Sequence, residues 1–139
     1  MTERFIAQRE FAVQPEALFA AWTEVSILSR WFGCGDDTLW TVHEWDVREG
    51  GAILVSLDFD GKPFEVHGEF LIVDPPRRLS YRWDADQTVN VTIERSGNGS
   101  LLTLEHQWPP TNEDRSMLDA GWKNALEQLR HLVEDAVAP

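Results

Sequence analysis

Most of the chain between Leu39 and Trp108 alternates between apolar and polar residues with a period of two. This period is typical of β-strands that have one buried and one solvated face. Turn residues such as Gly50-Gly51 and Asp60-Gly61 separate the runs, and the short connections predict an antiparallel meander. The segments predicted as strands are Leu39 to Val47, Ala52 to Phe59, Phe64 to Val73, Leu79 to Trp83, Thr88 to Glu94 and Leu101 to Trp108.

The period changes at both ends of this region. Thr2 to Phe11 alternates loosely and is predicted as a first strand, whereas Pro15 to Trp22 and Thr23 to Trp31 have the apolar spacing of two short helices. Thr111 to Val137 is predicted as one long amphipathic helix, close to 40 Å at ~1.5 Å per residue. Its apolar stripe is Leu118, Trp122, Ala125, Leu129, Leu132 and Ala136.

Two features of the long helix lead to further expectations. Thr111 with Asp114 resembles a capping box at its start. Gly121 lies inside the helix, where glycine costs ~1 kcal/mol relative to alanine, so we expect a close backbone approach there.

Strand alternation assigns each residue to a face. The buried face is predicted to include His43, Phe64, Ile72 and His106, and the opposite face His67. Either buried histidine is a hydrogen-bonded core residue, or it orients a polar group on a bound molecule. His131 is expected to lie off the apolar stripe of the long helix.

The amino-acid composition disfavours some classes of partner and favours others. Twelve basic and 24 acidic residues give a formal charge of −12, which disfavours nucleic acid and anionic membrane surfaces as partners. Seven tryptophans and seven phenylalanines against one tyrosine favour either a strong core or the walls of an apolar site. A single cysteine, Cys34, and the lack of a signal peptide or membrane span lead us to expect a cytoplasmic protein.

Motifs for common chemistry are missing from the sequence. The four histidines lack zinc-ligand spacing, so we expect no metal and no cofactor. Glu65 and Glu69 flank His67, but on a polar, open face that would not tune an acid/base pair.

The order of the predicted elements resembles the helix-grip fold of the START-like superfamily, also called SRPBCC. Short motifs favour the branch similar to the C-terminal domain of activators of the Hsp90 ATPase. These motifs are Pro15 to Thr23, Trp31-Phe32-Gly33, Asp46 to Gly51, Gly68, Pro75 to Leu79, Gly121-Trp122 and Leu129. The resemblance implies one α+β domain over residues 1–139, with a seven-stranded curved antiparallel sheet wrapped around a long C-terminal helix. Two short helices would lie between strands 1 and 2.

The resemblance also implies a pocket between the sheet and the long helix. We expect it to hold an apolar or aromatic small molecule without catalysing a reaction. The residues expected to line it are Trp31, His43, Trp45, Phe59, Phe70, Tyr81, Trp83, His106, Trp108, Leu118 and Trp122. Two alternatives are a cyclase- or hydratase-like enzyme that uses His43 or His106 for proton transfer, and a chaperone-interacting module.

Overall fold

A computed structural model describes the backbone of residues 3–32, 38–59, 61–84, 86–110 and 116–137, and the side chains of 3–32, 41–58, 61–84, 86–110 and 121–135. The elements are β1 (Glu3–Phe11), α1 (Pro15–Thr23), α2 (Val25–Leu28), β2 (Thr38–Trp45), β3 (Ala52–Phe59), β4 (Lys62–Asp74), β5 (Arg78–Trp83), β6 (Gln87–Ser96), β7 (Gly99–Trp108) and α3 (Ser116–Val137). The order and type of the predicted elements are confirmed. The proposed capping box lies outside the described residues.

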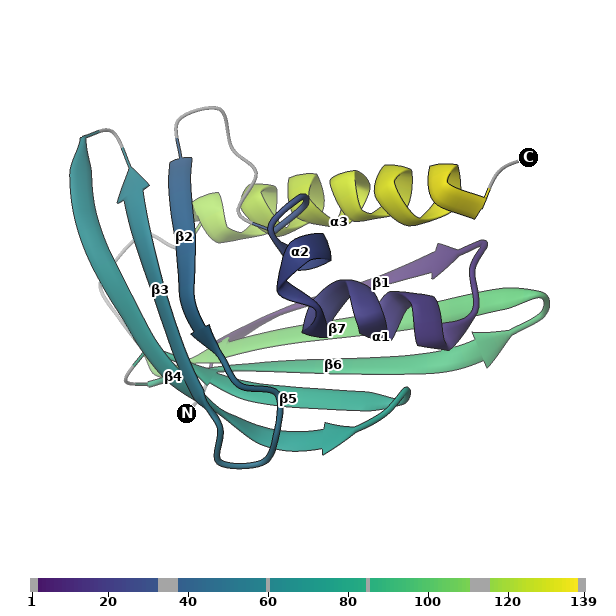
Figure 1. The fold of residues 1–139 in the computed structure, drawn as a ribbon, viewed down its shortest axis with the longest axis horizontal. Coiled ribbons are helices and arrows are strands. Elements are labelled where there is room, and N and C mark those ends of the chain that lie inside the picture. The colour runs from purple at the N-terminus through teal and green to yellow at the C-terminus, as the bar shows by residue number, and fades with distance from the viewer. Residues whose placement is uncertain (1–2, 33–37, 60, 85, 111–115, 138–139) are drawn as a thin grey trace.

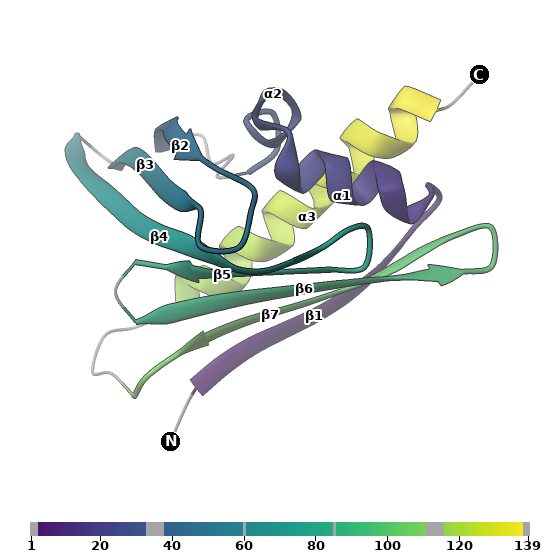
Figure 2. The same cartoon turned by 60° about the horizontal axis from the view of Figure 1, so that its bottom comes forward.

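Seven antiparallel strands form one sheet in the order β1-β7-β6-β5-β4-β3-β2. The sheet curves, and all three helices lie on its concave side, with α3 running across it (Figures 1 and 2). Short turns join β2 through β7, so neighbours in sequence are neighbours in the sheet. This arrangement is the helix-grip fold that the sequence predicts.

The helix α3 contacts the sheet through a stripe slightly different from the predicted one. Among its described side chains, 121–135, the buried residues are Trp122, Ala125, Leu126, Leu129 and Val133, whereas Leu132 is only partly buried. The stripe therefore includes two apolar residues that the prediction omitted, Leu126 and Val133. Near the other end of the helix, Arg130 donates to the Glu10 carbonyl oxygen at 2.9 Å, and its guanidinium lies 5.5 Å from the centre of the Phe11 ring. These contacts link α3 to the edge strand β1.

Two β-bulges correct the predicted faces. The register shifts between Val42 and Glu44, and His43 is exposed on the convex face, where its Nε2 lies 2.6 Å from Ser56 Oγ. A second shift between Phe70 and Ile72 places Ile72 opposite Ser80 on the convex face. A bulge adds one residue to a strand, so strict alternation fails beyond it. The prediction that His43 and Ile72 lie on the buried face is wrong.

Gly68 and Gly121 illustrate a close approach and an open position. A Cβ atom at Gly68 would overlap the backbone carbonyl oxygen of Arg82 on β5. At Gly121 a Cβ atom would meet nothing within 4 Å, and the residue is exposed. The expected close approach at Gly121 is therefore wrong, and the sheet rather than the helix contains one.

We predict opposite stability effects for alanine at these two glycines. Gly68→Ala should lower the free energy of unfolding by about 1–3 kcal/mol, because the new methyl group forces β4 and β5 apart. Gly121→Ala should raise it by about 1 kcal/mol, because alanine is the better helix former. Urea denaturation measures both, and a Gly68→Ala protein as stable as Gly121→Ala would contradict the packing described here.

Candidate ligand-binding site on the concave face

The concave face holds a cluster of aromatic rings centred on Trp22 of α1 and Tyr81 of β5, both fully buried. The Trp22 indole N–H donates to the Tyr81 hydroxyl oxygen at 3.2 Å. Trp45 on β2 donates its indole N–H to the Trp22 carbonyl oxygen at 3.0 Å, and Trp31 donates to the Ala21 carbonyl oxygen at 2.9 Å. Polar groups thus join the short helices to both halves of the sheet.

The same rings contact one another directly. Trp22 and Trp31 meet edge to face with centroids 4.7 Å apart. Phe70 lies 5.2 Å from Trp45 and 5.8 Å from Tyr81, again edge to face. Separations of this size are favourable for aromatic pairs. Of the predicted site residues, Trp31, Trp45, Phe70 and Tyr81 are therefore brought together, and each is packed by other side chains.

Trp122 extends this cluster from α3 and connects it to His106 on β7. The Trp122 indole N–H donates to His106 Nδ1 at 2.9 Å, so the neutral ring carries its proton on Nε2. That Nε2 atom lies 2.7 Å from Gln87 Oε1 and donates to it. Trp108 packs 5.7 Å from His106 and donates its own indole N–H to Glu3 Oε2. His106 is a buried, hydrogen-bonded residue as one of its two predicted interpretations required.

Trp83, at the end of β5, differs from these tryptophans. It is only partly buried, and it contacts the rings of Phe32 at 5.6 Å and Tyr81 at 6.3 Å. Among the residues whose side chains are described, none accepts a hydrogen bond from its indole N–H. Trp83 therefore forms the boundary of the packed cluster.

Beyond Trp83 the concave face stays apolar, and it is less covered only at the Leu57–Phe64 pair among the described residues of β3 and β4. Leu57 on β3 pairs with Phe64 on β4; Leu57 is partly buried and Phe64 is 51% exposed. Val55 and Val66 pair in the adjacent part of the sheet and are buried. The predicted site omitted Leu57 and Phe64, although alternation placed both on the buried face.

Of the remaining predicted residues, His43 does not join the cluster. His43 is exposed on the convex face, as described above. The side chains of Phe59 and Leu118 lie outside the described residues. Trp22 and Phe32 also belong to the cluster, although the predicted site omitted them. Their position near Trp31 in the short-helix region is the sequence feature that could have identified them.

Among the described side chains, no three histidine, cysteine, aspartate or glutamate residues gather as metal ligands would. Within the described ranges, no helix has both the length and the apolar character needed to span a membrane.

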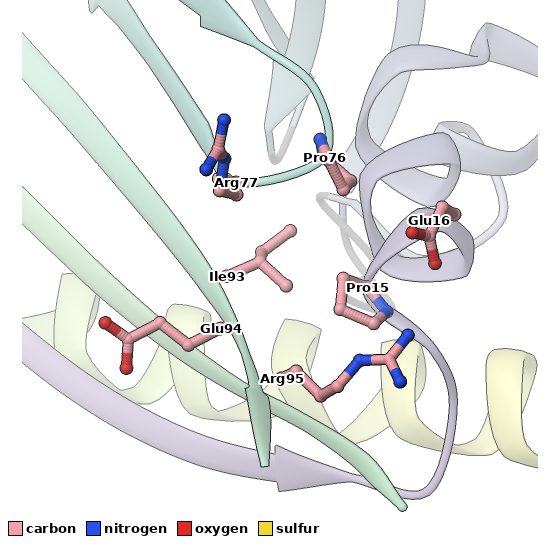
Figure 3. Close-up of a pocket in the computed structure, with 7 residues that line it drawn as sticks. All are labelled: Pro15, Glu16, Pro76, Arg77, Ile93, Glu94 and Arg95. Atoms are coloured by element: carbon pink, nitrogen blue, oxygen red, sulfur yellow. The ribbon is translucent and has the colours of Figure 1, made fainter.

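A separate surface depression lies between the start of α1, the β4–β5 turn and β6 (Figure 3). It has a volume of about 440 Å³. The lining residues are Pro15, Glu16, Pro76, Arg77, Ile93, Glu94 and Arg95. Arginines and glutamates are mixed at its rim, and none of the predicted site residues lines it.

Burial controls the titration of Tyr81. Loss of solvent raises the pKa of the Tyr81 hydroxyl far above its usual value, and the hydrogen bond from Trp22 opposes this rise only in part. The unfolded chain ionises its tyrosine at about pH 10. The protonated Tyr81 hydroxyl therefore makes its full contribution to the free energy of unfolding below about pH 10. This contribution is lost progressively as the pH rises above 10.

Tyr81 is the chain's only tyrosine, so its ionisation can be followed by the ultraviolet absorbance of tyrosinate. We predict no tyrosinate absorbance in the folded protein as the pH passes 10, and its appearance together with loss of the circular dichroism signal at higher pH. A tyrosinate signal that rises near pH 10 while the protein remains folded would contradict the buried position of Tyr81.

Comparison with known proteins places this geometry in a family. A crystal structure of a Chromobacterium violaceum protein shares 25% sequence identity, covering 94% of this chain and 97% of that one, with a TM-score of 0.85. The solution structure of the AHSA1-like protein from Aeromonas hydrophila is 22% identical over 96% and 94% of the two chains, with a TM-score of 0.80. No curated protein sequence matches. The model of the family Activator of Hsp90 ATPase homolog 1-like protein matches residues 12–134, so the chain belongs to that family.

Proposed function

We propose that the protein binds a neutral, apolar or aromatic small molecule on the concave face of the sheet, beyond the packed aromatic cluster. The observation that carries this proposal is Phe64, a large apolar side chain that is 51% exposed on the face where the other rings are buried. With Leu57 and Trp83 it forms what we call the open apolar surface. Apolar area left uncovered next to a core favours a ligand that removes it from water.

The charges around this surface support a neutral ligand. From Ile53 to Leu57 on β3, from Phe64 to Phe70 on β4, and from Leu79 to Trp83 on β5, every inward-facing residue is uncharged. A charged group placed there would lose its hydration without gaining a partner of opposite charge. The formal charge of −12 disfavours an anionic ligand further.

Proton-transfer catalysis at the same site has less support. Both ring nitrogens of His106 have hydrogen-bond partners, Trp122 and Gln87. His43 lies on the opposite face of the sheet. A general acid or base must come within hydrogen-bond distance of its substrate, so these positions favour binding over catalysis.

A charge on the open apolar surface should weaken binding. We predict that Phe64→Asp weakens the affinity for 1-ethylpyrene, a neutral apolar fluorescent probe, about tenfold or more, because a buried unpaired carboxylate would oppose the ligand. Since Phe64 is half exposed, the variant should keep the fold, as circular dichroism can verify.

The matched control is Ile6→Asp, which changes an apolar residue of 49% exposure on the convex side of β1. It should bind 1-ethylpyrene like the unaltered protein. If both variants bind equally well, the probe lies elsewhere. If the unaltered protein binds no apolar probe and is recovered from cells without any small molecule, the proposed function is wrong.

A further inference from the structure

The tryptophans of the concave face differ in one respect that bears on the ligand. Trp22, Trp31, Trp45, Trp108 and Trp122 each donate the indole N–H to a protein acceptor. Trp83 does not do so within the described part of the chain. A buried N–H without an acceptor is destabilising, so a ligand that covered Trp83 would have to supply an acceptor.

The position of Trp83 makes such an encounter possible. The ring is held by Phe32 and Tyr81 on the side of the packed cluster. On the sheet, Glu69 pairs with Arg82, so the neighbouring Gly68 lies beside Trp83 and adds no side chain there. Gly68 is itself buried, so a ligand would meet the partly exposed ring of Trp83 and not the strand backbone.

The spacing of residues along β4 sets the length of the ligand. Gly68 and Phe64 are four residues apart on β4, which corresponds to about 13 Å at the rise of an extended strand. The inward-facing residue midway between them is Val66, which is buried. A ligand that contacts both Trp83 and Phe64 is thus an elongated molecule, such as several fused rings.

We propose that Trp83 determines the specificity of this surface: its indole N–H donates a hydrogen bond to a carbonyl or ether oxygen at one end of an elongated, neutral, otherwise apolar ligand. The inference rests on the proposed function and adds the chemical group that the ligand must carry. A hydrocarbon of the same shape binds more weakly, because covering Trp83 leaves the N–H without a partner.

Two probes of nearly the same shape distinguish the hydrogen bond of Trp83 from the burial of apolar surface. 1-Acetylpyrene carries a carbonyl acceptor, and 1-ethylpyrene lacks it. We expect the unaltered protein to bind 1-acetylpyrene roughly three- to tenfold more tightly, the range for one net hydrogen bond. In Trp83→Phe, which keeps a ring but has no N–H, the two affinities should become equal.

Nuclear magnetic resonance of the unaltered, ¹⁵N-labelled protein gives a second measurement that does not depend on the variant's folding. The Trp83 indole N–H signal should shift more with 1-acetylpyrene than with 1-ethylpyrene, and the signal lost in Trp83→Phe assigns it. Equal affinities of the two probes for the unaltered protein, or a preference that persists in Trp83→Phe, would overturn the role of Trp83 but leave the proposed function intact. Binding of neither probe would overturn the role of Trp83, and together with recovery of the protein from cells without any small molecule it would overturn the proposed function as well.

Discussion

The buried indole N–H groups impose the main constraint on this molecule. Each indole ring that enters the core adds apolar area, and it also brings one N–H donor that must be paired. Trp22 donates to the Tyr81 hydroxyl on β5, and Trp45 donates to the Trp22 carbonyl oxygen on α1. Trp122 of α3 donates to His106 on β7. The pairs connect α1 to both halves of the sheet and fix α3 against it. Cluster packing and element placement therefore depend on the same few hydrogen bonds.

This constraint divides the concave face into two parts. Around Trp22 and Tyr81 the indole N–H groups are paired and the rings lie in contact, so added atoms would have to displace protein. Around Leu57 and Phe64 the face is equally apolar but less covered. Trp83 lies between the two parts and combines a packed ring with an indole N–H that has no acceptor in the described part of the chain. A binding function on this face belongs to the second part, and the first part supplies a rigid wall for it.

The fold could be predicted from the sequence because its signals are local and repeated. Alternation, turn residues and the C-terminal stripe each indicate the element to which they belong, and together they indicate the helix-grip arrangement. His43 and Ile72 were misplaced because a β-bulge adds a residue without changing composition, so no apolar pattern reveals it. Gly121 was misread because an exposed glycine and a glycine at a close contact look alike in sequence. The site was predicted in part: large aromatic residues were recognised, but which rings pair their N–H groups depends on distances that the sequence does not contain.

The central claim is that an apolar ligand occupies the open apolar surface and leaves the packed cluster unchanged. Intermolecular nuclear Overhauser effects between bound 1-ethylpyrene and the methyl groups of the labelled protein measure this most directly. We expect effects to the Leu57 methyl groups and none to those of Leu71, which is 43% exposed at the β4 bulge. Effects to Leu71 without effects to Leu57 would contradict this claim.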